Sequence, residues 1–97
     1  MDSAAAAFNG AVAFELRLAR HDSGMTIEEL VQRSELNRST MLRYIYNQRA
    51  IPVPALFQIA VALDVAPAEI LARAALRSRD ERHAERARGE RARHSRG

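Results

Sequence analysis

Apolar residues recur along this chain at intervals of three and four positions, which is the spacing of one face of an α-helix. Five segments show this spacing, and no segment alternates apolar and polar residues as a half-buried strand does. The pattern predicts an all-α fold: a compact five-helix domain over residues 9–76, followed by a charged C-terminal extension.

The first predicted helix runs from about Gly10 to Asp22, with Asn9 as its N-cap and Ser23-Gly24 at its end. Its apolar stripe consists of Val12, Phe14, Leu16, Leu18 and Ala19. Residues 1–8 are then expected to form an N-terminal arm that precedes the domain.

The second predicted helix begins after Thr26. Glu29 follows three residues later, and this spacing indicates a capping box, in which each side chain satisfies a backbone N–H of the first turn. Ile27, Leu30 and Val31 are expected to face inward, and the helix should end near Ser34. Leu36 is expected to enter the core from the turn.

The third predicted helix begins after Asn37, a residue type that caps helix N-termini well. Met41, Tyr44 and Ile45 fall at i, i+3 and i+4 and predict its buried stripe. Asn47 stands where a helix end often needs a left-handed residue, a conformation that asparagine tolerates. Together with the second helix, this segment forms a helix-turn-helix over residues 26–47.

Prolines mark the starts of the last two helices, because a proline in the first turn loses no helical hydrogen bond. Pro52 and Pro54 bracket the start of the fourth helix, and Pro67 opens the fifth. The residues expected to face inward are Leu56, Ile59, Ala60 and Leu63, then Ile70 and Leu71.

Charge divides the chain into two parts. All 15 basic residues counted as Lys+Arg are arginines. Residues 1–76 carry a net charge of −1, whereas the arginine-rich extension, residues 77–97, carries +4. Because the extension has no large apolar residue, it is expected to be a solvated helix or disordered. It could add affinity for phosphates or assist self-association.

Several function classes receive no support from the sequence. The chain has no cysteine, its three histidines (His21, His83 and His94) are too scattered for a metal site, and it has no glycine-rich phosphate loop. No apolar run approaches the length of a membrane span, and the N-terminal SAAAA segment lacks the basic leader of a signal peptide. We therefore expect no catalysis, metal, cofactor, small-molecule ligand or membrane insertion.

The outward face of the third helix is the strongest candidate for a binding surface. Arg38, Ser39, Thr40 and Arg43 project from it, and Leu42 is expected to project beside them. Arginine presents a planar fork of donors that matches guanine O6 and N7, and hydroxyl groups can bond to several base edges. This face is suited to reading a DNA major groove.

From about Leu16 to Leu71 the chain resembles the lambda repressor/Cro-like helix-turn-helix domains, also called the XRE family. The matching positions are Arg20, Gly24-Met25-Thr26, Glu28-Glu29-Leu30-Val31, Leu36-Asn37-Arg38-Ser39-Thr40-Met41, Arg43, Arg49, Pro52, Leu56, Ile59-Ala60, Ala62-Leu63, Val65 and Ile70-Leu71. Each short match is weak alone, but the joint register extends through all five helices.

The resemblance implies roles for particular residues. Arg38, Ser39 and Arg43 would contact bases, with Asn37 and Thr40 at the edge of that set. The phosphate contacts would come from Arg20, Tyr46, Asn47, Gln48 and Arg49, and from backbone amides at the start of the second helix.

Three positions depart from the family pattern. Ile27 replaces a glutamine that clamps a phosphate and braces the reading helix. Glu35 replaces a glycine in the turn and brings negative charge near the DNA face. Ile45 replaces a glutamate that pairs with the helix-one arginine, so Arg20 is expected to be freer to reach a phosphate.

The resemblance implies a transcriptional regulator that binds a double-stranded DNA operator in the bacterial cytoplasm, at the nucleoid. Small members of this kind are phage immunity repressors or Cro-like proteins. The alternative is a protein-binding antitoxin or anti-repressor with the same fold. A monomer and a homodimer are both open, and Ala68, Leu71, Ala72, Ala75 and Leu76 could supply a dimer patch or belong to the core.

Overall fold

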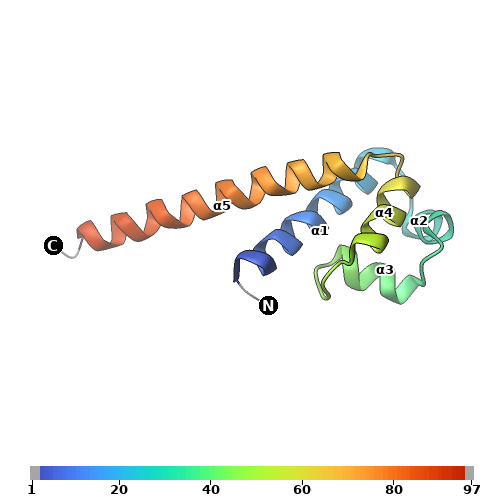
Figure 1. The fold of residues 1–97 in the computed structure, drawn as a ribbon, viewed down its shortest axis with the longest axis horizontal. Helices are drawn as coiled ribbons and strands as arrows, with labels where there is room; N and C mark the ends of the chain where they lie inside the picture. The colour runs from blue at the N-terminus through green and yellow to red at the C-terminus, as the bar shows by residue number, and fades with distance from the viewer. Residues whose placement is uncertain (1–2, 96–97) are drawn as a thin grey trace.

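The computed structural model describes residues 3–95, and the side chains of residues 3–90. Within that range the chain forms helices and no strand, which confirms the all-α prediction. The helices are α1 (Ser3–Ser23), α2 (Ile27–Ser34), α3 (Arg38–Ile45), α4 (Val53–Ala62) and α5 (Pro67–Ser95). In Figure 1, α1 lies along α5, while α2, α3 and α4 gather at one end of the molecule.

The core lies where the five helices meet. Each helix contributes at least one large, fully buried side chain: Leu16, Leu30, Met41, Ile45, Ile59 and Ile70. Burying one such side chain contributes about 1.5–3 kcal/mol. All buried positions predicted for α3 and α4 are confirmed, and Leu36 packs against the core from the turn.

The prediction for the start of α1 is wrong. The helix already begins at Ser3, so Asn9 lies inside it and is not its N-cap, and residues 3–8 are not a separate arm. Residues 1–2 of that predicted arm lie outside the described residues. The physical reason is the alanine run over residues 4–7, since alanine is the best helix former.

The predicted stripe of α1 is wrong in part. Val12 and Leu16 are buried, but Phe14 and Leu18 are 38% and 39% exposed. At 100° per residue these two lie together on the opposite side of the helix from Val12 and Leu16. The predicted burial of Leu71 is wrong for a similar reason, because Ile70 takes the core position and leaves its neighbour at the surface.

Local chemistry sets the helix ends as predicted. The Thr26–Glu29 capping box is present, and the Asn37 side chain caps α3. Asn47 has φ +58°, in the left-handed region. Pro52 is the N-cap residue of α4, with Pro54 in the first turn, and α5 begins at Pro67.

The long helix α5 joins the domain to the extension without a break. A partly buried ion pair fastens it to α1: Glu15, whose side chain is 5% exposed, accepts from Arg77 Nε at 3.0 Å. The Arg77 guanidinium also lies 3.9 Å from the centre of the Phe14 ring. Beyond this contact α5 continues past α1, so the helical alternative for the extension holds over the described residues (Figure 1).

Candidate nucleic-acid interface

The turn between α2 and α3 is held by a network centred on the buried Ser34. Its hydroxyl donates to the Val31 carbonyl at 3.1 Å and accepts from the Leu36 N–H at 3.3 Å. Gln58 of α4 donates to the Ser34 carbonyl at 3.4 Å. These bonds fix the angle at which α3 leaves α2, and therefore the direction of its outer face.

Glu35 occupies the turn position where the family pattern has glycine. Its φ is +62° and ψ +17°, so the chain keeps the left-handed turn without the residue that adopts it freely. An L residue in this region carries a penalty of about 1–2 kcal/mol. The turn therefore has a left-handed residue that is strained, and it holds an exposed carboxylate beside α3.

We expect Glu35→Gly to raise the free energy of unfolding by about 0.5–1 kcal/mol, because glycine relieves the left-handed strain and its greater freedom in the unfolded chain offsets only part of the gain. Urea denaturation measures this. Glu35→Gln is the control, since it removes the charge and keeps the strain. Equal stability of the two variants would show that position 35 is not strained.

The first turn of α3 is ordered by the Asn37 side chain. Its Oδ1 accepts from the N–H groups of Ser39 at 2.9 Å and Thr40 at 3.5 Å, and from the Ser39 hydroxyl at 2.6 Å. The carbonyl oxygen of Asn37 is therefore used inside the protein. The amide hydrogens of Asn37 and the lone pairs of Ser39 Oγ are left for an outside partner.

The predicted base-reading residues do not all have the same environment. Arg38, Ser39 and Arg43 are exposed on α3, whereas Thr40 is half-buried. The prediction that Leu42 projects outward is wrong, because it is half-buried against the core. In the part of the chain that is described, the Arg43 guanidinium has no hydrogen bond or ion pair.

Arg38 is held by a carboxylate from the first turn of α2. Its Nε donates to Glu28 Oε1 at 3.2 Å, and both side chains are largely exposed. This engagement leaves the two terminal nitrogens of the guanidinium as an unoccupied pair. Ile27 is half-buried against the core and cannot clamp a phosphate, so the contact from α2 to the start of α3 comes from Glu28 instead.

We expect Glu28→Gln to reduce discrimination at the base pair that Arg38 reads by about three- to fivefold, the value of an exposed ion pair. Binding to random DNA should become tighter, because a negative charge leaves the surface. Competition binding with single-base variants of the site measures both effects. Glu35→Gln removes an equal charge and should leave the discrimination intact; if the two variants behaved alike, the ion pair would have no part in base reading.

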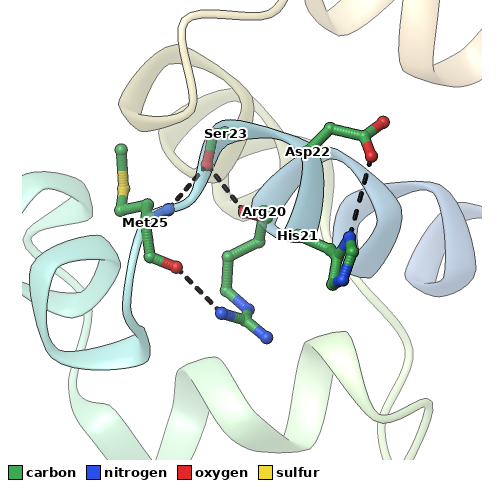
Figure 2. Close-up of polar contacts among 5 residues, drawn as sticks. All are labelled: Arg20, His21, Asp22, Ser23 and Met25. Atoms are coloured by element: carbon green, nitrogen blue, oxygen red, sulfur yellow. Dashed lines mark hydrogen bonds and ion pairs between the residues drawn. The ribbon is translucent and has the colours of Figure 1, made fainter.

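Arg20 lies in the last turn of α1, next to the loop that leads to α2 (Figure 2). Its Nη1 donates to the Met25 carbonyl at 2.8 Å. Ser23 closes the same loop: its hydroxyl donates to the Arg20 carbonyl at 2.7 Å and accepts from the Met25 N–H at 3.1 Å. The Met25 carbonyl thus takes one donor of Arg20 in place of the absent glutamate, and the predicted contact of Arg20 with a phosphate stays a prediction.

The loop after α3 carries most of the predicted phosphate contacts. The N–H groups of Tyr46, Asn47 and Gln48 close the end of α3 through bonds to Leu42, Tyr44 and Arg43 carbonyls, at 3.0, 3.2 and 2.8 Å. Gln48 and Arg49 are exposed, with no side-chain hydrogen bond or ion pair inside the described region. Tyr46 is also exposed. These side chains remain available to a ligand.

Asn9 of α1 anchors this loop. Its Nδ2 donates to Asn47 Oδ1 at 2.8 Å and to the Arg49 carbonyl at 3.2 Å, while its Oδ1 accepts from the Ile51 N–H at 2.8 Å. The neighbouring Gly10 lets the loop approach, since a Cβ there would lie 3.2 Å from Asn47 Nδ2. The loop is therefore positioned from a helix 38–42 residues away in sequence.

Arg17 is a second residue of α1 that reaches the end of α3. Its Nη1 donates to the Ile45 carbonyl. Its guanidinium lies 5.6 Å from the centre of the Phe14 ring and 5.9 Å from that of Tyr46. It thereby braces the C-terminal end of α3, a role that the sequence pattern did not indicate.

The sequence-predicted residues thus fall into three places: the predicted base-contacting set on α3 and its N-cap, the set from Tyr46 to Arg49 just beyond α3, and Arg20 in the last turn of α1. The structure adds a supporting set that sequence reasoning missed, namely Asn9, Arg17, Glu28, Ser34 and Gln58. Arg17 lies three residues before Arg20, so the two share one side of α1. Nothing else in the neighbouring sequence indicated that Arg17 contacts α3. The other contacts depend on the tertiary fold.

Two further properties concern the described residues as a whole. No group of three or more His, Cys, Asp or Glu side chains among them is placed to hold a metal ion. No single helix in residues 3–95 is long and apolar enough to cross a membrane. The helix α4 and the part of α5 up to Glu90 reach that length and composition only when they are taken together, and this pair is bent by 110°.

Comparisons with known proteins found a matching family and a similar solved structure. The family model for the Cro/C1-type HTH DNA-binding domain matches residues 15–75. The crystal structure of the clp gene regulator ClgR from C. glutamicum is similar, with a TM-score of 0.66 and 25% sequence identity over 70% of this chain and 88% of that one. No curated protein matches the sequence.

Proposed function

The chain belongs to the Cro/C1-type helix-turn-helix DNA-binding family, and on this premise we propose that it is a transcriptional repressor that occupies a double-stranded operator. The observation that carries the proposal is the outer face of α3, where Arg43 is exposed and unpaired and Arg38 offers two terminal nitrogens. Similarity to a transcriptional regulator supports it.

In this proposal α3 lies in the major groove. Arg43 and Arg38 each contact a guanine through O6 and N7, and Ser39 Oγ accepts from a neighbouring base edge. Asn37 can donate its amide hydrogens at the edge of the groove. Thr40 has a smaller part, because it is half-buried.

The phosphate contacts hold the duplex in register with α3. Arg49, Gln48 and the Tyr46 hydroxyl lie together at the C-terminal end of the helix and take the phosphates on that side. Asn47 serves mainly to shape the loop, since its Oδ1 is bonded to Asn9. Arg20 contributes only through the donors that Met25 leaves unused.

Repression follows from occupancy in the bacterial cytoplasm, where a bound protein excludes polymerase from an overlapping promoter. Within this proposal the protein is a phage immunity repressor or a Cro-like regulator. The protein would act as a homodimer on a palindrome with half-sites about one helical turn apart, or as a monomer on an asymmetric site. The α5 patch that could join two copies, residues 68, 71, 72, 75 and 76, is exposed.

Selection of bound duplexes from a random library, followed by a promoter reporter carrying the recovered sequence, tests this function. We expect a defined motif and reduced reporter expression when the protein is present. The symmetry of the motif distinguishes a dimer from a monomer. Recovery of no motif would refute the proposal.

A protein-binding function, as an antitoxin or anti-repressor, is the second candidate. The observation that favours it is an apolar stripe on the surface of α4, where Val53, Phe57 and Val61 are each more than half exposed at i, i+4 and i+8. Partner binding through this stripe would depend little on salt between 50 and 200 mM, in contrast to DNA binding.

A further inference from the structure

The C-terminal part of α5 carries a stripe of basic side chains that the reading helix does not use. Arg79, Arg82, His83 and Arg86 follow one another at i, i+3, i+4 and i+7, so they share one face of the helix. All four line a single surface hollow of about 270 Å³. Arg79 and Arg86 are separated by about 10 Å along the axis at 1.5 Å per residue.

Acidic neighbours neutralise the stripe only at its C-terminal end. Asp80, Glu81 and Glu85 fall on the other faces of α5, whereas Glu90 shares the face of the stripe one turn beyond Arg86. Over residues 3–90 the guanidinium groups of the three stripe arginines have no hydrogen bond or ion pair, in contrast to Arg73 and Arg77, which pair with Glu69 and Glu15. The stripe therefore carries three unpaired guanidinium groups and one carboxylate, a net positive charge.

The chemistry of this face fits phosphate groups better than a protein surface. A protein interface needs an apolar centre, and from Arg79 to Arg86 the stripe contains no apolar side chain. Arginine forks match phosphate oxygens and are weakly hydrated, so they bind phosphates at a low desolvation cost.

The helix-turn-helix segment has little net positive charge of its own to attract phosphates. Residues 26–49 carry four arginines and three glutamates, and residues 1–76 have a net charge of −1. In DNA-binding proteins the non-specific part of the affinity comes from neutralised phosphates. Here most of the positive charge lies on the extension, at +4.

The stripe cannot contact the same base pairs as α3. The body of the domain contacts α5 mainly through α1, and the C-terminal part of α5 projects away from the α2–α3 end of the molecule (Figure 1). Any DNA it contacts lies outside the few base pairs read by α3.

We propose that the Arg79–Arg86 face of α5 is a second, sequence-independent binding surface for the phosphate backbone of double-stranded DNA outside the base-read site. This inference rests on the proposed function, because it assigns the flanking DNA as a second ligand of the same complex. It gives the helical extension a role in affinity without a role in choosing the sequence.

The test measures the salt dependence of binding to two duplexes, the selected site alone and the same site with flanking DNA on both sides. For the full chain carrying Arg82→Ala and Arg86→Ala, the slope of log K against log salt on the flanked duplex should fall by nearly two units, at about 0.9 per lost phosphate contact. On the short duplex the parent and the variant should bind alike. Alanine preserves the helix.

Arg88→Ala is the matched control, because it removes an arginine two residues from Arg86 on the opposite side of the helix. It should leave the slope on the flanked duplex near the parent value. Equal slopes for the stripe variant and the parent would overturn the proposal. Polyglutamate, a polyanion without phosphate groups, serves as a second probe. A stripe variant that no longer bound polyglutamate but bound the flanked DNA like the parent would also overturn the proposal. Failure of the parent to prefer the selected site would instead count against the proposed function.

Discussion

Asn9→Ala is expected to lower the free energy of unfolding by about 2 kcal/mol and the melting temperature by about 10 °C for a domain of this size. The side chain makes three hydrogen bonds, to Asn47, Arg49 and Ile51, each worth about 1 kcal/mol. Alanine is a better helix former than asparagine by about half a kcal/mol, which offsets part of the loss. Thermal unfolding followed by circular dichroism measures the change.

The same substitution should weaken DNA binding beyond its effect on folding. Without Asn9 the Asn47–Arg49 segment loses its attachment to α1, so its phosphate-contacting side chains are no longer held in register with α3. Binding measured by fluorescence anisotropy at 10 °C, where the variant remains folded, separates this effect from instability.

Two controls make the Asn9 prediction specific. Asn9→Asp keeps an acceptor for the Ile51 N–H but places a carboxylate oxygen against Asn47 Oδ1 and the Arg49 carbonyl, which are both acceptors, so its stability should also fall below that of the parent. His21→Ala changes an exposed polar residue of the same helix and should shift stability by less than about 0.5 kcal/mol. A melting temperature for Asn9→Ala within one degree of the parent would contradict the assigned anchor.

Arg43→Ala is expected to reduce affinity for the selected site by about 10- to 100-fold, the value of one bidentate arginine–guanine contact. The free energy of unfolding should change little, because the side chain is exposed and unpaired in the described structure. Fluorescence anisotropy against the selected duplex and a random one measures the loss. Binding to the random duplex should fall less than binding to the site.

Arg43→Lys distinguishes base reading from simple attraction. Lysine keeps the positive charge but lacks the planar fork, so discrimination should fall while the salt dependence of binding stays close to that of the parent. If lysine preserved discrimination in full, Arg43 would act on the backbone and not on a base.

Local chemistry made much of this fold predictable. The Thr26–Glu29 box, the Asn37 cap and the prolines at 52, 54 and 67 each act within a few residues of themselves, so helix starts could be derived from their neighbours. The left-handed Asn47 followed from the same kind of argument.

The errors have a common physical cause, which is contact between residues far apart in the chain. Asn9 has the residue type of a cap, but its side chain is used across 38–42 residues, and the alanines before it extend the helix. Arg20 lacks the glutamate partner of the family pattern and donates instead to the Met25 carbonyl, a contact that no spacing in the sequence indicated. Glu28 and Arg38 meet only because the Ser34 turn sets the angle between their helices.

Most of the residues that the resemblance assigned to DNA are exposed on α3, its N-cap and the loop after it; Thr40 and Arg20 are half-buried, and Arg20 lies in α1. Their supports were not foreseeable. Arg17, Gln58 and Asn9 hold α3 and its loop from α1 and α4, and each contact requires the folded arrangement. The absence of the family's glutamine at Ile27 could be read from the sequence. The contact that Glu28 makes with Arg38 in its place could not.

The central claim is that α3 reads bases through Arg43. The most direct test is parallel selection of bound duplexes from one random library by the parent and by Arg43→Ala. The account predicts a parent motif with a strongly preferred G·C pair at one position, and loss of that single preference in the variant while the rest of the motif persists. The same motif from both proteins, with every position unchanged, would contradict it.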